Sequence, residues 1–284
     1  MGEHIVWSGR KIPVLGTFDV LVCGGGPAGF AAAVAAARNG AHTGMLERNG
    51  FPGGMASAGM VNPIYGFFAR HVQVVTGVAQ ELIDRLGEIS GGTSGHVYRH
   101  DCIARREKMG ECLTGTDEAS CPVASVAQVC PVDSEAVKLG ALELVDESGA
   151  EICLHTHVVD VQKVGDAIQA VVVYGKSGFG AYTAKLVVDA TGDADVVALS
   201  GAPFHKGSEE DRATKPPTLM FRIGNVKRTK DRIRARWPKE AATGTAGNEC
   251  WLMALPRPGE YSVNSPSGLN HIIRRWNLLL RIAS

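Results

Sequence analysis

The stretch Val20–Gly54 constrains the fold of this chain more than any other part of the sequence. It contains the glycine pattern G-x-G-x-x-G, formed by Gly24, Gly26 and Gly29. The elements predicted around it are a buried strand over Val20–Cys23, an alanine-rich helix over Ala28–Asn39 and a second strand over Thr43–Leu46. In such a strand–turn–helix unit the first glycine permits the turn, the second leaves room for phosphates, and the third lets helix and strand pack closely. The pattern therefore predicts a site for the pyrophosphate of a dinucleotide at the helix N-terminus.

Two further residues strengthen this interpretation. Pro27 suits the first helical turn, because the N–H that proline lacks would have no partner there. Glu47 follows Gly29 by 18 residues, close to the ~20 expected for the acid that hydrogen-bonds a ribose hydroxyl. A tight turn without a ligand is the alternative, since glycines punctuate many loops, but the flanking strand, helix and acid disfavour it.

Composition excludes several classes of function. The chain has 284 residues, enough for one large or two modest domains, and a net charge of zero, so we expect no nucleic-acid partner. The N-terminus lacks an apolar core of signal-peptide length, and no run reaches the ~18 apolar residues of a membrane span. These features and the odd number of cysteines, seven, predict a cytoplasmic protein with reduced thiols.

Residues 48–133 contain one clear helix and one irregular insertion. Apolar residues at helical spacing predict a helix over Val72–Leu86, packed on the core. Residues 88–133 form the irregular insertion, with four cysteines, Cys102, Cys112, Cys121 and Cys130. Iron–sulfur and zinc sites usually include a tight C-x-x-C pair, and none occurs here. Scattered reduced cysteines are therefore favoured, and an iron–sulfur cluster stays open as a less favoured alternative.

The next part of the chain again predicts a buried strand that leads into a turn with a glycine, as in the opening stretch. The predicted elements are a helix over Ser134–Asp146 with Asp133 as its N-cap, and strands over Glu151–His155, Val158–Val164 and Ala167–Tyr174. A turn is expected near Gly175–Gly180, followed by a buried strand over Leu186–Val188. That strand would bring Thr191, Gly192 and Asp193 to the carboxyl edge of the parallel sheet, where ligands bind. His155 and His157 would share one side of a strand, but no third metal ligand lies near them, so no metal is predicted.

The residue composition of the sequence changes after residue 201, where we place a domain boundary. Residues 1–201 are the first domain, and residues 202–284 are a second, substrate-facing domain. The second domain is expected to contain strands over Leu219–Ile223, Trp251–Leu255 and Tyr261–Asn264, and the basic run Lys227–Trp237 as a solvated helix face. Leu269–Ala283 predicts an amphipathic helix that packs on its own protein rather than on a membrane.

Together these motifs resemble the FAD-dependent oxidoreductases of the glutathione-reductase-like superfamily. The resemblance is nearest to the flavin subunit of heterodisulfide reductase, with fumarate reductase and succinate dehydrogenase flavoproteins more distant. The motifs that carry it are GGGPAG, LERNGFPGGMASAGMVNP, VQVVTGVAQELIDRL, PVDSEAVK, GAEICLHTHVVDV, VVDATGDADV, SGAPFHKG and PPTLMFRIG, over roughly residues 18 to 225. The resemblance implies an α/β fold. It consists of a Rossmann-like FAD-binding domain with a parallel central sheet and an added β-meander, plus a partial substrate domain.

The resemblance also implies roles for individual residues. Gly24, Gly26 and Gly29, with Pro27 and Ala28 between them, match the turn on the pyrophosphate. Glu47 matches the acid on the adenosine ribose, and Arg48 is its neighbour along that moiety. The loop from the phosphates toward the flavin ring corresponds to Gly54, Met55 and Ala56, the backbone contact with adenine to Val158, and the segment that closes over FAD to Thr191, Gly192 and Asp193.

The C-terminal part departs from the family pattern. Members of the superfamily return from the substrate domain to a glycine-rich turn near the flavin ring, and no such segment follows residue 225, so we expect a chain truncated at the C-terminus. The predicted function is FAD-dependent oxidoreduction of a small-molecule substrate, or electron exchange with a redox partner protein. No catalytic residue is predicted. The alternatives are a truncated flavoprotein that binds nucleotide without catalysis, and an NAD(P)-dependent or flavin-using biosynthetic enzyme on the same scaffold.

Overall fold

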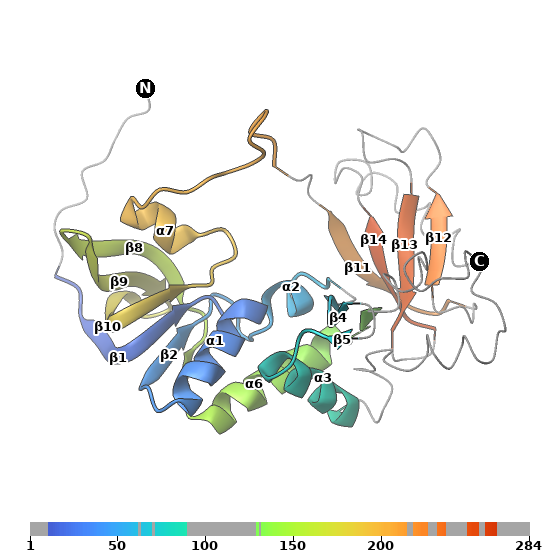
Figure 1. Ribbon diagram of the computed structural model, residues 1–284, viewed down its shortest axis with the longest axis horizontal. Helices are drawn as coiled ribbons and strands as arrows, with labels where there is room; N and C mark the ends of the chain where they lie inside the picture. The colour runs from blue at the N-terminus through green and yellow to red at the C-terminus, as the bar shows by residue number, and fades with distance from the viewer. Residues whose placement is uncertain are drawn as a thin grey trace. The chain divides into compact units, whose positions relative to one another are not determined.

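The protein is described by a computed structural model. It describes residues 11–61, 64–69, 72–89, 129–130, 132–214, 218–226, 232–236, 249–255 and 259–265 (Figure 1). The chain forms two compact units, each made of two separate segments. Unit 1 comprises Met1–Phe51 and Val145–Phe204, and unit 2 comprises Pro52–Leu144 and His205–Ser284.

Unit 1 is built on a six-stranded sheet with the order β7-β2-β1-β10-β9-β8. Its strands are β1 (Val14–Cys23), β2 (Thr43–Leu46), β7 (Glu151–Cys153), β8 (His157–Val164), β9 (Ala167–Gly175) and β10 (Gly178–Asp189). The first four strands in this order are parallel, and β10, β9 and β8 form an antiparallel meander. This architecture confirms the predicted α/β fold with a parallel central sheet and an added meander.

One long strand joins the parallel and antiparallel parts of the sheet. β10 begins at Gly178 and runs without a break to Asp189, so it pairs with β9 in its first half and with β1 from Ala181 onward. The sequence suggested a turn reaching Gly180 and a separate short strand later. That prediction was wrong in extent, because the turn is confined to the β9–β10 hairpin and small residues continue the strand.

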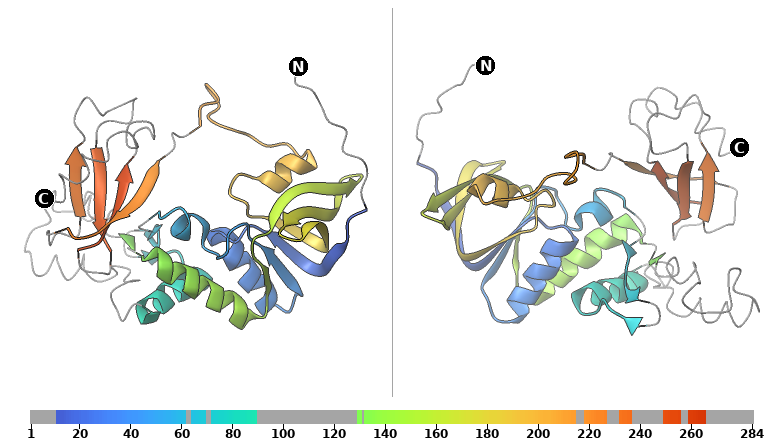
Figure 2. Two further views of the ribbon diagram at one scale, coloured as in Figure 1. Left: turned by 180° about the vertical axis from the view of Figure 1, so that it is seen from behind. Right: turned by 45° about the horizontal axis from the view of Figure 1, so that its top comes forward.

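Two helices pack on this sheet, α1 (Pro27–Arg38) against β1 and β2, and α7 (Asp195–Ser200) against β8 and β10 (Figures 1 and 2). The alanines of α1 let it lie close to the strands, and Phe30, Ala33 and Val34 form its buried face. Gly40, with a φ of +86°, follows its C-terminal end, which is the conformation that a helix stop requires. Sequence and structure therefore agree on this helix to within one residue at each end.

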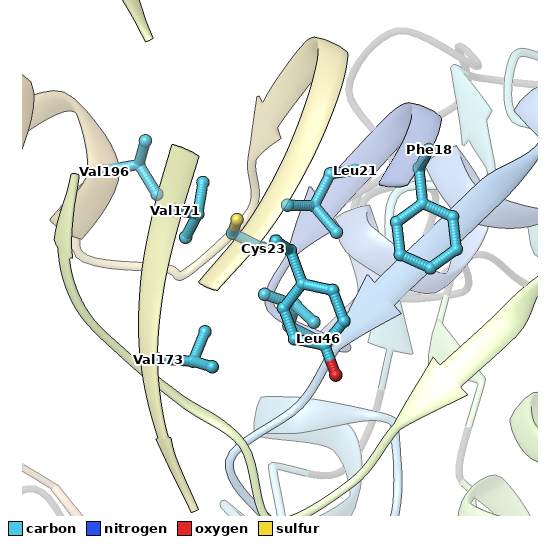
Figure 3. Packing of buried hydrophobic residues seen from close by; sticks show 8 residues of the cluster. Phe18, Leu21, Cys23, Leu46, Val171, Val173 and Val196 are labelled. Carbon is cyan, nitrogen blue, oxygen red and sulfur yellow. The ribbon is translucent and has the colours of Figure 1, made fainter. Parts of the chain in front are cut away.

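The core beside the glycine turn is apolar and tightly packed (Figure 3). Its buried members are Phe18, Leu21, Cys23, Leu46, Val171, Val173, Tyr182 and Val196. Cys23 is fully buried at the end of β1, directly before the first glycine of the turn. Burial, with a smaller contribution from the negative charge of Asp189, raises the pKa of the Cys23 thiol to about 12.

This buried thiol predicts a loss of stability at alkaline pH. The pKa of Cys23 in the folded protein is above its value in the unfolded chain, so its contribution is complete below pH ~9 and is lost as the pH rises toward 12. Relative to Cys23→Ala, the wild type should lose about 1.4 kcal/mol of unfolding free energy between pH 8 and pH 10. Urea unfolding of both proteins at the two pH values measures this difference, and parallel losses in the two proteins would contradict it.

Unit 2 combines helices with a second sheet. Its elements are α2 (Gly54–Ser57), β3 (Ile64–Tyr65), β4 (Phe68–Ala69), β5 (Val72–Gln73), α3 (Val78–Ile89), β6 (Val129–Cys130), α6 (Ser134–Ser148), β11 (Leu219–Ile223), β12 (Arg232–Arg236), β13 (Glu249–Ala254) and β14 (Tyr261–Ser265). The last residues of α6, from Val145, belong to unit 1. The sheet has the order β11-β14-β13-β12 and is antiparallel throughout.

The helices α3 and α6 pack against each other through a glycine. A Cβ on Gly140 would lie 3.2 Å from a methyl carbon of Leu82 and 3.4 Å from one of Leu86, so any larger residue there would press on α3. The predicted helix over Val72–Leu86 was wrong at its start. Residues 72–73 form β5, paired with β4, and the helix begins only after Gly77, whose φ is +64°.

An arginine connects the two chain segments of unit 2. Arg222 on β11 lies 3.1 Å from Asp133 and 3.5 Å from Glu260, measured between nitrogen and oxygen. Asp133 is also the helix cap that the sequence predicted, because its Oδ1 accepts the N–H of Glu135 at 2.9 Å. The helix face predicted over Lys227–Trp237 was wrong where it can be checked, since residues 232–236 form β12.

Several predictions fall outside the described residues. These are the structure around Cys102, Cys112 and Cys121 and the C-terminal amphipathic helix. Among the described residues, no helix has the length and apolar character needed to span a membrane.

Candidate dinucleotide-binding site

The first and third glycines of the turn between β1 and α1 have no room for a side chain. The N–H of Gly24 donates to the carbonyl of Leu46 at 2.8 Å, and its φ is +103°. A Cβ on Gly24 would lie 2.3 Å from the carbonyl oxygen of Ala190. A Cβ on Gly29 would lie 1.7 Å from the carbonyl oxygen of Gly24, which is less than any contact between non-bonded atoms. The first and third glycines of the motif thus hold β1, β10 and α1 in close contact, as the sequence predicted.

The N-terminus of α1 offers an anion site. Its N-cap is Gly26, which has no side chain to cap the helix, and Pro27 occupies the first turn. The first hydrogen bond within the helix runs from the N–H of Phe30 to the carbonyl of Gly26 at 3.0 Å. The amides before Phe30 have no partner inside the helix, and the helix dipole adds partial positive charge at this end. Pro27 and Ala28 are exposed, so this end of the helix is open to a ligand.

Glu47 supports the turn from the opposite side. It is the first residue after β2 and only 4% exposed. Its Oε2 accepts the N–H of Gly25 at 2.8 Å, and its Oε1 accepts the backbone and side-chain N–H groups of Asn49 at 2.7 and 2.8 Å. A carboxylate has about four lone-pair sites, so Glu47 retains capacity for a ligand hydroxyl after these three bonds. The structure therefore brings Glu47 to the glycine turn, with a second role that the sequence did not suggest.

Asp189 is a site residue that sequence reasoning missed. It ends β10, and its Oδ1 accepts the N–H and the hydroxyl of Thr191 at 3.1 and 2.8 Å. Its Oδ2 accepts the N–H of Val197 at 2.9 Å, and the Thr191 hydroxyl accepts the N–H of Asp195 at 2.8 Å. Asp189 thus shapes the turn that contains Thr191. The signal in the sequence was an acid placed directly after a buried strand and two residues before a threonine, a spacing that favours an Asx-type turn.

The turn after β10 lies beside the glycine turn. The N–H of Ala190 donates to the carbonyl of Cys23 at 2.8 Å, which joins the carboxyl ends of β10 and β1. Gly192, with a φ of +89°, and Asp193 are exposed at this edge of the sheet. The predicted arrival of residues 191–193 at the carboxyl edge of the parallel sheet is therefore confirmed.

The remaining predicted site residues lie in different surroundings. Arg48 is exposed, and Val158 is half-buried on β8, against the apolar core. Gly54, Met55 and Ala56 belong to unit 2, where they begin α2; Met55 is 62% exposed and Ala56 is buried.

The structure gives no support for a metal site in the part of the chain that it describes. Across these residues no cluster of three or more histidine, cysteine or acidic side chains could hold a metal ion. His155 and His157 do not share a strand, because β7 ends at Cys153, β8 begins at His157, and His155 lies between them with a φ of 51°.

Residues 19–275 match the protein family described as FAD dependent oxidoreductase. No curated protein matches the chain.

The similar solved structures share the fold at low sequence identity. A geranylgeranyl bacteriochlorophyll reductase-like protein from Thermoplasma acidophilum is 18% identical, with a TM-score of 0.54 over 94% of this chain and 60% of its own. The p-nitrophenol 4-monooxygenase from Pseudomonas putida DLL-E4 is 14% identical, with a TM-score of 0.54 over 94% of this chain and 63% of its own. An aromatic hydroxylase from angucycline biosynthesis is 18% identical, with a TM-score of 0.50 over 88% and 44%. The chain thus spans between 44% and 63% of the length of these proteins.

Proposed function

Because this chain belongs to the family of FAD-dependent oxidoreductases, whose cofactor is FAD, we propose that unit 1 binds the ADP part of FAD and that the protein is a flavin-dependent oxidoreductase. The observation that carries the proposal is the open N-terminus of α1. It is framed by two glycines that cannot bear a side chain and by a buried carboxylate, that of Glu47, directly after the neighbouring strand.

The residues present fit this cofactor. The uncapped amides of α1 would hold the pyrophosphate, and the missing Cβ atoms of Gly24 and Gly29 let the turn sit tightly under it. Glu47 would accept a hydrogen bond from the adenosine ribose while it holds the N–H of Gly25. When bound, FAD supplies the transfer of a hydride or of electrons; the protein supplies binding, orientation and exclusion of water.

The finer assignments rest on the family resemblance. Val158 would meet the adenine through its backbone, residues 191–193 would close over the cofactor, and Gly54–Ala56 would continue toward the flavin ring. The motif order also supports a place near the flavin subunit of heterodisulfide reductase, and hence a small-molecule substrate or a redox partner protein. The odd number of cysteines, seven, supports the proposal of a reducing, cytoplasmic setting.

Cofactor titration tests this proposal directly. Purified chain with FAD at about 100 times its dissociation constant should gain about 2.7 kcal/mol of stability, and thus melt roughly 5–10 °C higher. ADP should give a smaller shift of the same sign, and NAD⁺ should not exceed it. The visible spectrum of the protein and identification of the cofactor released on denaturation complete the measurement. A colourless protein whose melting temperature does not respond to FAD or ADP would refute the proposal.

A further inference from the structure

The chain beyond β2 and β7 continues as a pair of hydrogen-bonded segments, residues 47–50 and 153–156, which we call the outer loop pair. The N–H of Glu47 donates to the carbonyl of Cys153, and the N–H of Thr156 donates to the carbonyl of Glu47, both at 2.9 Å. The N–H of His155 donates to the carbonyl of Asn49 at 3.1 Å. The backbone of Glu47 thus makes two of the hydrogen bonds that hold the outer loop pair together, while its carboxylate supports the glycine turn.

His155 has an unusual position in this pair. Its φ is 51°, in the left-handed region that side-chain-bearing residues seldom adopt, and the residue is exposed. Such outliers are more frequent at ligand sites than elsewhere, although histidine tolerates this region better than most residues. Among the described residues none forms a hydrogen bond with its ring nitrogens.

Gly50 provides the room for the His155 ring. A Cβ on Gly50 would lie 2.9 Å from both Cε1 and Nε2 of the imidazole. The backbone of Gly50 is not in the positive-φ region, so its contribution is space for the ring in this position and not a special conformation. Gly50 lies four positions after the end of β2, and His155 lies two positions after the end of β7. The exposed ring of His155 thus lies against the backbone of Gly50, in the loop that follows Glu47.

We propose that the His155 ring forms one wall of the adenine subsite and stacks on the base of FAD. The inference rests on the function proposed above, which places the pyrophosphate at α1 and the ribose at Glu47. The base is attached to that ribose, and the outer loop pair is the part of unit 1 that continues from Glu47 and is hydrogen-bonded to its backbone. The exposed ring of His155, held over Gly50, is the aromatic face of this loop pair that we assign to the base.

The variant His155→Asn tests the stacking without disturbing the backbone. Asparagine adopts the left-handed region readily but has no ring. Because stacking of a base on an aromatic side chain is a substantial interaction, His155→Asn should weaken FAD and ADP by the same factor, about five- to hundredfold. Binding is followed by the quenching of flavin fluorescence for FAD and by calorimetry for ADP. The melting temperature of the unliganded variant should equal that of the wild type, and His155→Phe should retain most of the affinity.

A second substitution tests the role of the glycine. Gly50→Ala leaves the histidine but takes its space, and it should reproduce the loss of affinity in the wild-type background. In the His155→Asn background it should add little, because two changes that act through one contact are not additive. Unchanged affinity for FAD and ADP in His155→Asn would overturn the inference and leave the proposed function intact. A wild-type chain that binds neither nucleotide would overturn both.

Discussion

Replacing Gly29 by alanine should weaken FAD binding at least a hundredfold and lower the unfolding free energy by about 3 kcal/mol or more. The added methyl group would lie 1.7 Å from the carbonyl oxygen of Gly24, 2.8 Å from the carbonyl carbon of the same residue and 3.2 Å from the Cβ of Ala190. The first two are backbone atoms, which have no rotamer to change, so α1 itself must move away from β1. That movement displaces the helix N-terminus and opens the turn that we assign to the pyrophosphate.

Gly224→Ala is the matched control for this substitution. Among the described residues, none lies within 4 Å of the position that a Cβ on Gly224 would take, and the φ of Gly224 is not in the positive region. Its replacement should change the unfolding free energy by less than about 0.5 kcal/mol and leave FAD binding unchanged. Fluorescence titration with FAD and urea unfolding measure both proteins. If Gly29→Ala binds FAD within threefold of the wild type, the close packing of turn and helix is not what forms the site.

Replacing Glu47 by alanine should raise the dissociation constant of FAD roughly 10- to 150-fold, because a hydrogen bond to a charged group is worth about 1.5–3 kcal/mol. It should also destabilise the unliganded protein by about 1–3 kcal/mol, since the N–H of Gly25 is buried and loses its acceptor. Glu47→Gln should fall between the two proteins. The amide keeps the size of the side chain, but whichever way it is turned, its NH₂ group faces an N–H donor.

Asn49→Ala separates the two roles of Glu47. It removes one N–H donor from Oε1 but leaves the backbone N–H of residue 49 and the bond from Gly25 in place. We expect FAD affinity within about threefold of the wild type for this variant. Paired measurements of FAD affinity and unliganded stability then distinguish ribose binding from turn support. A Glu47→Ala protein that loses stability but keeps its FAD affinity would exclude the ribose assignment.

The sequence predicted those parts of the fold whose elements are determined by residues close together in the chain. β1, the glycine turn, α1 and β2 follow one another with short connections, and each carries its own signal in apolar runs, glycines or alanines. The Glu47 position followed from spacing alone. The meander was implied by the family resemblance, while β8 and β9 were visible as separate strand-like runs; the turn between them contains Gly165, whose φ is +59°.

The errors arose where tertiary pairing outweighs local pattern. Val72 continues the apolar spacing of α3, but Val72 and Gln73 pair with β4 instead. In β12 the alternation of arginine with Ile233 and Ala235 has the period of a strand, and its charge alone suggested a solvated helix. The proximity of the His155 ring to Gly50 depends on chain segments brought together by the sheet, and no spacing in the sequence could reveal it. The contacts of Asp189 are local, and its spacing to Thr191 was the signal that was overlooked.

The pairing of β1 with β10 also sets the order of events during synthesis. These two strands lie side by side in the middle of the sheet, yet partners such as Thr17 and Thr183 are 166 positions apart in the chain. At 5–20 residues per second, a ribosome releases β10 roughly ten to thirty seconds after β1. During that time the apolar strand β1 has β2 on one side and an open edge on the other, the kind of surface that promotes aggregation. The nascent chain therefore keeps this edge unpaired until β10, which ends at Asp189, has been synthesised.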